Sequence, residues 1–138
     1  MKIPFVFKKR LNSFTLVELL VVLVIIGILV LLALPRLMPL ISRAKSTEAQ
    51  LQLGHVHTLE KSYFYLKSKY SKVPDEIGFE QEKLVTEGGT SNYLIEITEA
   101  SSSSFEGRAT AVVDFDGDGI FNVWEIDQDK NLVEVTKD

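Results

Sequence analysis

The sequence contains no cysteine and only two histidines among its 138 residues. Without cysteine the chain has neither a disulfide to close its folded region nor a thiol nucleophile. It also lacks the serine elbow and the glycine-rich phosphate loop by which many enzyme active sites are recognised. His55 and His57 stand two positions apart in a helical pattern, so they point to different faces and do not suggest a metal pair. We therefore predict that the protein is not an enzyme.

A surplus of basic residues is also missing, because the chain has 15 Lys and Arg against 19 Asp and Glu. Four of the bases lie in the first 13 positions, and the remaining chain carries a net charge of −8. These four residues are Lys2, Lys8, Lys9 and Arg10. A protein that holds nucleic acid through many phosphate contacts needs a broad basic surface. No direct nucleic-acid binding is therefore expected.

What the chain does have is a long apolar run directly after this basic start. Residues 19–34 include no polar side chain, and a helix over residues 14–34 would span about 30 Å, enough to cross a bilayer. One charge, Glu18, lies near the start of the run. A charged side chain at the centre of a bilayer costs about 2.5–3.5 kcal/mol even on the lenient insertion scale. Glu18 is therefore expected to have a functional partner.

The residues around this charge carry a family resemblance. The order of a basic leader, Ser13-Phe14-Thr15-Leu16-Val17-Glu18 and an apolar run resembles the class III signal of type IV pilins and type II secretion pseudopilins. The resemblance implies that a prepilin peptidase cuts between Ser13 and Phe14 and that the new Phe14 amine is methylated. It also implies that Glu18, the fifth mature residue, pairs with the Phe14 amine of a neighbouring subunit during assembly. The chain departs from the family pattern at Ser13, where most members have glycine.

Two other interpretations of the N-terminal segment explain less. A secretory signal peptide has an apolar region of about 7–15 residues that ends in a small-residue cleavage site, and residues 32–36 offer none. A plain single-pass anchor fits the length of the run but gives no role to Glu18.

Beyond the apolar run, the sequence predicts one amphipathic helix and then strands. The expected organisation is a leader at residues 1–13, a transmembrane and assembly helix at 14–35, an amphipathic helix at 36–71 and a β-domain at 72–138. Pro35 and Pro39 predict a bend or local unwinding of the helix. One apolar stripe with 3-4-3-4 spacing is expected to face a sheet, and it consists of Val56, Leu59, Tyr63, Leu66 and Tyr70.

The β-domain is predicted from a change of hydrophobic period. Residues 93–98, 108–113, 121–126 and 132–135 look like short strands with short connections, which favours an antiparallel meander. The fold class is therefore α+β, with the long N-terminal helix packed on an antiparallel sheet of about four strands. This arrangement is the pilin fold that the resemblance implies.

Residues 114–125 match the twelve-position calcium loop D-x-[DN]-x-[DN]-G-x5-E without a gap. Ca²⁺ takes six to eight oxygen ligands, and acids at alternate positions can direct their carboxylates to one point. The predicted ligands are Asp114, Asp116, Asp118, the carbonyl of Ile120, Asn122 and Glu125. Because strands are expected on both sides of the loop, Asp127 or Asp129 could replace Glu125. An Asp-Gly hairpin turn with solvated acids is the alternative to a calcium site.

The resemblance and these patterns lead to one functional expectation. The chain is expected to be a structural subunit of a type IV pilus-like filament, with identical subunits, the prepilin peptidase and an inner-membrane assembly platform as partners. It would lie in the bacterial inner membrane as a precursor and then in an extracellular or periplasmic filament. The alternatives are a pseudopilin of a type II secretion system, a monomeric membrane-anchored calcium-binding module at the cell surface, and a DNA receptor, which the acidic charge disfavours.

Overall fold

The computed structural model of the chain describes residues 13–138, which fall into two units with a boundary between Pro35 and Arg36. One 52-residue helix, α1 (Leu16–Lys67), contributes to both units. Apart from Ser13, the predicted leader lies outside the described residues.

The described part of the N-terminal unit consists of residues 13–15 and the first part of α1. An 18-residue window of this helix has a mean hydropathy of 3.3, and none of the window is buried within the chain. Its length and composition are sufficient to cross a membrane. The helix continues through Pro35 and Pro39, so the local unwinding that these prolines predict is not found in α1.

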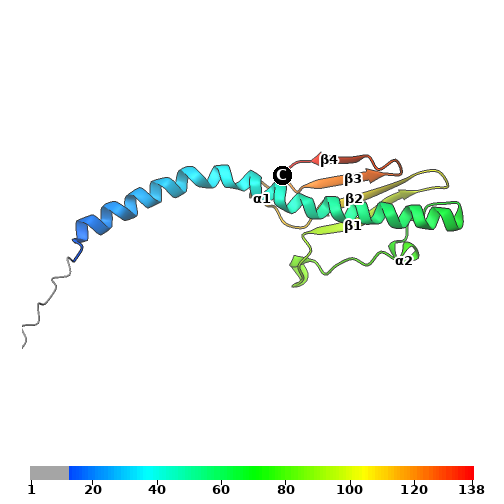
Figure 1. The fold of residues 1–138 in the computed structure, drawn as a ribbon, viewed down its shortest axis with the longest axis horizontal. Helices are drawn as coiled ribbons and strands as arrows, with labels where there is room; N and C mark the ends of the chain where they lie inside the picture. The colour runs from blue at the N-terminus through cyan, green and yellow to red at the C-terminus, as the bar shows by residue number, and fades with distance from the viewer. Residues whose placement is uncertain (1–12) are drawn as a thin grey trace, which may run out of the picture. The chain divides into compact units, whose positions relative to one another are not determined.

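The second unit contains a four-stranded antiparallel sheet whose spatial order follows the sequence (Figure 1). The strands are β1 (Tyr93–Ala100), β2 (Phe105–Ala111), β3 (Val123–Asp127) and β4 (Leu132–Thr136). On β1 and β2 the side chains alternate between buried and more exposed positions, so one face of each strand lies in the core. Each predicted strand corresponds to an observed one, although β2 begins three residues earlier than predicted.

The C-terminal part of α1 covers the inner face of this sheet (Figure 1). The buried positions of this part include Ala49, Leu53, Val56 and Glu60, which are spaced 4-3-4 along the helix. The predicted stripe was therefore wrong in part, because Leu66 is 81% exposed and Tyr70 is buried beyond the end of the helix. One of the buried positions is Glu60, which places a carboxyl group in the core where the apolar pattern predicted only hydrophobic side chains.

Gly107 of β2 allows α1 to lie close to the sheet. A Cβ at this position would stand 3.2 Å from Cγ2 of Ile126, 3.5 Å from Leu53 and 3.6 Å from Val56. Those side chains are buried, so they have little room to move away.

The connector between α1 and β1 contains two short helical turns, α2 (Pro74–Ile77) and the 3-10 turn η1 (Val85–Glu87). Ile77 and Phe79 are buried, so this connector contributes to the hydrophobic core. The long helix on a four-stranded antiparallel sheet confirms the predicted α+β, pilin-like fold.

Candidate functional site

The first turn of α1 holds Glu18 in a reciprocal cap. The backbone N–H of Glu18 donates to Oγ1 of Thr15 at 3.2 Å, and the backbone N–H of Thr15 donates to Oε2 of Glu18 at 2.9 Å. The Thr15 hydroxyl also donates to the same oxygen, at 3.1 Å. This is the capping box of a helix N-terminus, in which a threonine at the cap and an acid three residues later satisfy each other's backbone donors.

The cap gives Glu18 a partner, Thr15, within its own chain. This contact was not predicted from the sequence, although the pattern Thr-x-x-Glu signals it. Among residues 13–138 the ion pairs that form involve Arg108, and Glu18 is in none of them. Its negative charge is therefore hydrogen-bonded but has no counter-charge in the described part of the chain.

Ser13 and Phe14 lie just before α1 in non-helical backbone. Both are exposed, and Phe14 exposes 83% of its surface. A peptidase binds its substrate in an extended conformation more readily than in a helix, because helical carbonyl and amide groups are already paired. The Ser13–Phe14 bond therefore lies in backbone that a protease can engage.

The second candidate site is the acidic loop between β2 and β3. Asp114 accepts hydrogen bonds from two backbone N–H groups, with Oδ1 from Gly117 at 2.6 Å and with Oδ2 from Gly119 at 2.7 Å. Gly117 and Gly119 have φ angles of 82° and 87°, in the left-handed region that favours glycine. Asp116 accepts from the N–H of Asp118, so the loop is folded around its own carboxylates.

These contacts favour the ionised form of Asp114, the first acid of the loop. The backbone N–H of Gly119 lowers the pKa of the Asp114 carboxyl most, and that of Gly117 adds to the effect. A carboxylate with a lowered pKa is available as an anionic oxygen ligand over a wider pH range.

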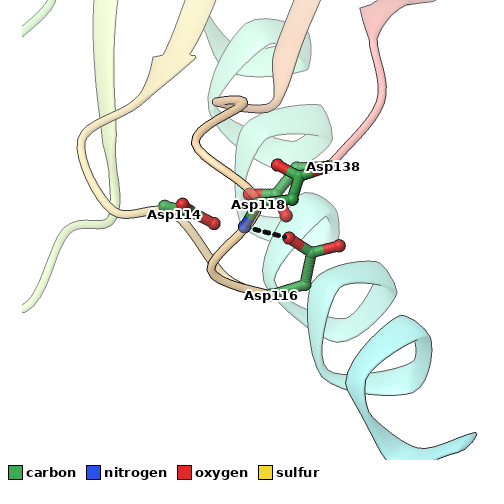
Figure 2. A group of neighbouring side chains, drawn as sticks. All are labelled: Asp114, Asp116, Asp118 and Asp138. Atoms are coloured by element: carbon green, nitrogen blue, oxygen red, sulfur yellow. Dashed lines mark hydrogen bonds between the residues drawn. The ribbon is translucent and has the colours of Figure 1, made fainter. Parts of the chain in front are cut away.

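A fourth acid, Asp138, joins the three acids of the loop, as Figure 2 shows. Carboxylate oxygens of Asp114, Asp116, Asp118 and Asp138 all lie within 4.8 Å of one another. The Oδ2 atom of Asp138 accepts from the backbone N–H of Phe115 at 2.9 Å, whereas its Oδ1 atom is buried and has no hydrogen-bond partner. The sequence offered no signal for Asp138, because it follows the loop by many residues and belongs to no motif.

Asn122, the ninth position of the predicted calcium loop, is hydrogen-bonded within the folded core. It is fully buried, and its Oδ1 accepts from the Tyr93 hydroxyl at 2.7 Å. Its amide nitrogen donates to Glu134 at 2.8 Å and to the carbonyl of Thr136 at 3.0 Å. These bonds join β1, the acidic loop and β4.

Glu125, the twelfth position, lies on β3 and pairs with Arg108 directly across on β2, with an Nη2 to Oε1 distance of 2.6 Å. A helical loop exit would return position twelve to the ion, whereas a strand alternates its side chains between two faces. The structure therefore places Glu125 outside the acidic cluster. Ile120, whose carbonyl was another predicted ligand, is a half-exposed residue before β3.

The two suggested substitutes for Glu125 are also engaged elsewhere. Asp127 accepts from the backbone N–H groups of Asp129 and Asn131, both at 2.9 Å, and so closes the turn between β3 and β4. Burial raises the pKa of Asp127, but the hydrogen bonds from Asn131 and Asp129 outweigh it and lower the pKa overall. Asp129 accepts from the side chain of Gln128.

The chemistry of the cluster suits a hard cation. Four carboxylates supply only oxygen ligands, which Ca²⁺ and Mg²⁺ prefer, and the buried Asp138 oxygen without a partner is a group that a cation would satisfy. No thiol or imidazole belongs to this cluster in the described chain, so a zinc or copper site is not indicated.

Two comparisons relate the chain to known proteins. Residues 8–34 match the family model described as the prokaryotic N-terminal methylation motif. The type IV major pilin protein PilA of Myxococcus xanthus (strain DK1622) is 42% identical over 77 residues, which are 56% of this chain and 35% of that protein. The aligned region thus covers about a third of the relative's length. The chain carries a prokaryotic N-terminal methylation motif and is similar, over more than half of its own length, to a type IV major pilin.

Proposed function

We propose that the chain is a structural subunit of a type IV pilus-like filament. The observation that carries this proposal is the first part of α1, an apolar helix with no buried residue in its 18-residue window, which lies within the residues that match the methylation motif. Such a surface is unstable in water and requires either lipid or apolar protein around it. A membrane-bound precursor and a filament with the helices in its interior are two states that supply these surroundings.

Processing would connect the two states. In this proposal a prepilin peptidase cleaves the exposed, non-helical Ser13–Phe14 bond, and the released Phe14 amine is methylated. The basic leader would remain on the cytoplasmic side of the inner membrane, as the positive-inside rule favours. The mature subunit would then pass through an inner-membrane assembly platform into an extracellular or periplasmic filament.

Glu18 would supply the polar contact that sets the order of subunits. We propose that its carboxylate, held by Thr15 at the start of α1, forms an ion pair with the positively charged Phe14 amine of a neighbouring subunit. Removal of water strengthens such a pair, because the interaction between two charges grows as the effective dielectric constant falls.

Two substitutions at Glu18 distinguish the role of its charge from the role of its capping hydrogen bonds. Glu18→Gln keeps a side-chain oxygen for the Thr15 N–H but removes the charge, whereas Glu18→Ala removes both. Immunoblots of sheared surface material and of membranes measure assembly and precursor stability separately. The proposal expects both variants to accumulate processed subunit in the membrane with little in the sheared fraction. Assembly by Glu18→Gln at the normal level would show that only the cap is needed and would refute the charge pairing.

We further propose that the acidic loop binds Ca²⁺ in a structural role. Asp114, Asp116, Asp118 and Asp138 would hold the ion, which would offset the repulsion among four carboxylates. Asp138 also accepts a hydrogen bond from the Ser42 hydroxyl of α1 through its backbone carbonyl, at 2.6 Å. A bound ion would therefore stabilise the attachment of the last strand and its extension to the helix, in a chain without disulfides.

A further inference from the structure

Glu60 is a carboxyl group that α1 turns into the hydrophobic core. It has no exposed surface and follows Leu53 and Val56 on the buried face of the helix. Its Oε2 atom accepts one hydrogen bond, from the backbone N–H of Ser71 at 3.1 Å, and its Oε1 atom is buried without a partner. A carboxylate with one hydrogen bond and no cation is poorly compensated in such a place.

The segment against Glu60 is the chain reversal that follows α1, residues 68–73. It begins with Ser68 at a φ of 56°, a left-handed conformation that is strained for a residue other than glycine. Tyr70 anchors the segment, because its ring lies 4.8 Å from that of Phe64 and 5.0 Å from that of Phe105, and its N–H donates to the carbonyl of Ser101. We call residues 68–73 the cover.

A second carboxylate, that of Glu76, binds Ser71, the residue whose backbone N–H binds Glu60. Glu76 of α2 accepts from the Ser71 hydroxyl at 2.5 Å and from the Tyr63 hydroxyl at 3.3 Å. Ser71 thus lies between two acids, one bound to its N–H and one to its hydroxyl. The two acids therefore share one residue as a hydrogen-bond donor but contact different groups of it.

The surroundings shift the pKa values of the two acids in opposite directions. The Ser71 hydroxyl, with smaller contributions from Tyr63 and Lys69, lowers the pKa of Glu76. Burial raises the pKa of Glu60 more than the Ser71 N–H lowers it, and no charged group of the sheet, α1 or α2 adds to that balance. Of the two acids, Glu60 therefore keeps its proton to the higher pH.

We propose that Glu60 is a proton-controlled latch for the cover: the protonated side chain stays buried under residues 68–73, and its deprotonation opens them. A charged Glu60 is stable only in contact with water, and in this fold water reaches it when Ser71 moves away. Opening would also detach Tyr70 from Phe64 and Phe105. Because the pKa of Glu60 is raised in the folded state, the stability that it contributes is complete below its ordinary pKa and is lost as the pH rises through its folded-state pKa.

Amide hydrogen exchange on the full mature chain in detergent micelles tests the latch. If opening requires loss of the Glu60 proton, the protection factor of the Ser71 amide, corrected for intrinsic exchange, should fall about tenfold per pH unit between the ordinary pKa of a glutamate and the folded-state pKa of Glu60. The protection factor of the Ala109 amide, in the centre of the sheet, should not change over the same range. Glu60→Gln should make the Ser71 protection factor independent of pH, whereas Glu76→Gln should preserve its pH dependence.

A carbon-13 titration of the wild-type side-chain carboxyl groups provides a test that requires no variant to fold. The latch predicts that Glu60 titrates above the ordinary glutamate pKa of about 4.3 and Glu76 below it. It also predicts that the Ser71 amide shift follows the Glu60 transition. A Ser71 protection factor that does not depend on pH in the wild type, or a Glu60 that titrates together with Glu76, would overturn the proposal.

Discussion

Glu48 of α1 binds both donors of Asn92, the backbone N–H at 2.8 Å and the side-chain amide at 2.7 Å, and thereby joins the long helix to the residue before β1. The same carboxylate also accepts from the Ser91 hydroxyl at 3.0 Å. Since Ser91 and Asn92 are buried, these donors cannot turn to water if the carboxylate is removed.

Removal of this carboxylate should therefore destabilise the folded region. Glu48→Ala is expected to lower the free energy of unfolding by about 1–3 kcal/mol, because it leaves a buried N–H without an acceptor. Glu48→Gln keeps one acceptor oxygen and should cost less. Urea unfolding in detergent, followed by the fluorescence of the single tryptophan, Trp124, measures both variants. A Glu48→Ala protein as stable as the wild type would show that the hydrogen bonds of Glu48 to Ser91 and Asn92 do not contribute to stability.

The close approach of α1 to β2 gives a second stability prediction. Gly107→Val should lower the free energy of unfolding by about 1–3 kcal/mol, because the added carbons would press on Ile126 and Leu53. Gly54→Ala is the matched control, since its added Cβ meets nothing within 4 Å. It should stabilise the helix by roughly 0.5–1 kcal/mol. Equal stability of the two variants would mean that the core relaxes around position 107.

The start of α1 predicts the N-terminus of the mature protein. If the exposed Ser13–Phe14 bond is cut, mass spectrometry of the surface protein should detect a first residue of N-methylated Phe14 and no peptide from residues 1–13. Ser13→Gly, which introduces the residue that most type IV pilins have at this position, should be processed at least as fast. Recovery of the intact basic leader on surface protein would instead support a plain membrane anchor.

Calcium binding should be measurable as a gain in stability. A ligand that binds only the folded state at a hundredfold excess over its Kd adds about 2.7 kcal/mol. The unfolding midpoint of the mature chain in detergent should therefore fall in EGTA and recover with Ca²⁺. Recovery with Mg²⁺ should be smaller, because that ion demands a tighter octahedral site.

Substitutions distinguish the observed acidic cluster from the predicted twelve-position loop. Asp116→Asn with Asp118→Asn should abolish the calcium effect, and Asp138→Asn should weaken it. Glu125→Gln should preserve the effect, because the structure pairs Glu125 with Arg108 and not with the cluster. Identical unfolding midpoints of the wild type with and without chelator would identify the loop as an acidic turn only.

Much of this architecture is predictable from local patterns, and the exceptions have physical causes. Alternation of apolar residues locates β1, while Glu106 and Gly107 interrupt the apolar pattern and hide the beginning of β2. The helical period predicts a buried face but cannot reveal that Glu60 lies in it, because its burial depends on Ser71 and the cover. The acidic motif locates the loop, yet the strand geometry of β3 directs Glu125 away and the distant Asp138 takes a place in the cluster. Contacts between residues apart in sequence therefore determine the burial of Glu60 and the membership of the acidic cluster.

Immunogold electron microscopy of sheared surface material tests the filament proposal most directly. An epitope inserted between Ser102 and Ser103, in an exposed turn, marks the chain without disturbing the core. Cells that express the tagged chain with their own assembly machinery should yield filaments labelled along their length, and the Glu18→Ala strain should yield none. Abundant filaments without label, or labelled protein confined to membranes in the absence of filaments, would contradict the proposal that this chain is the filament subunit.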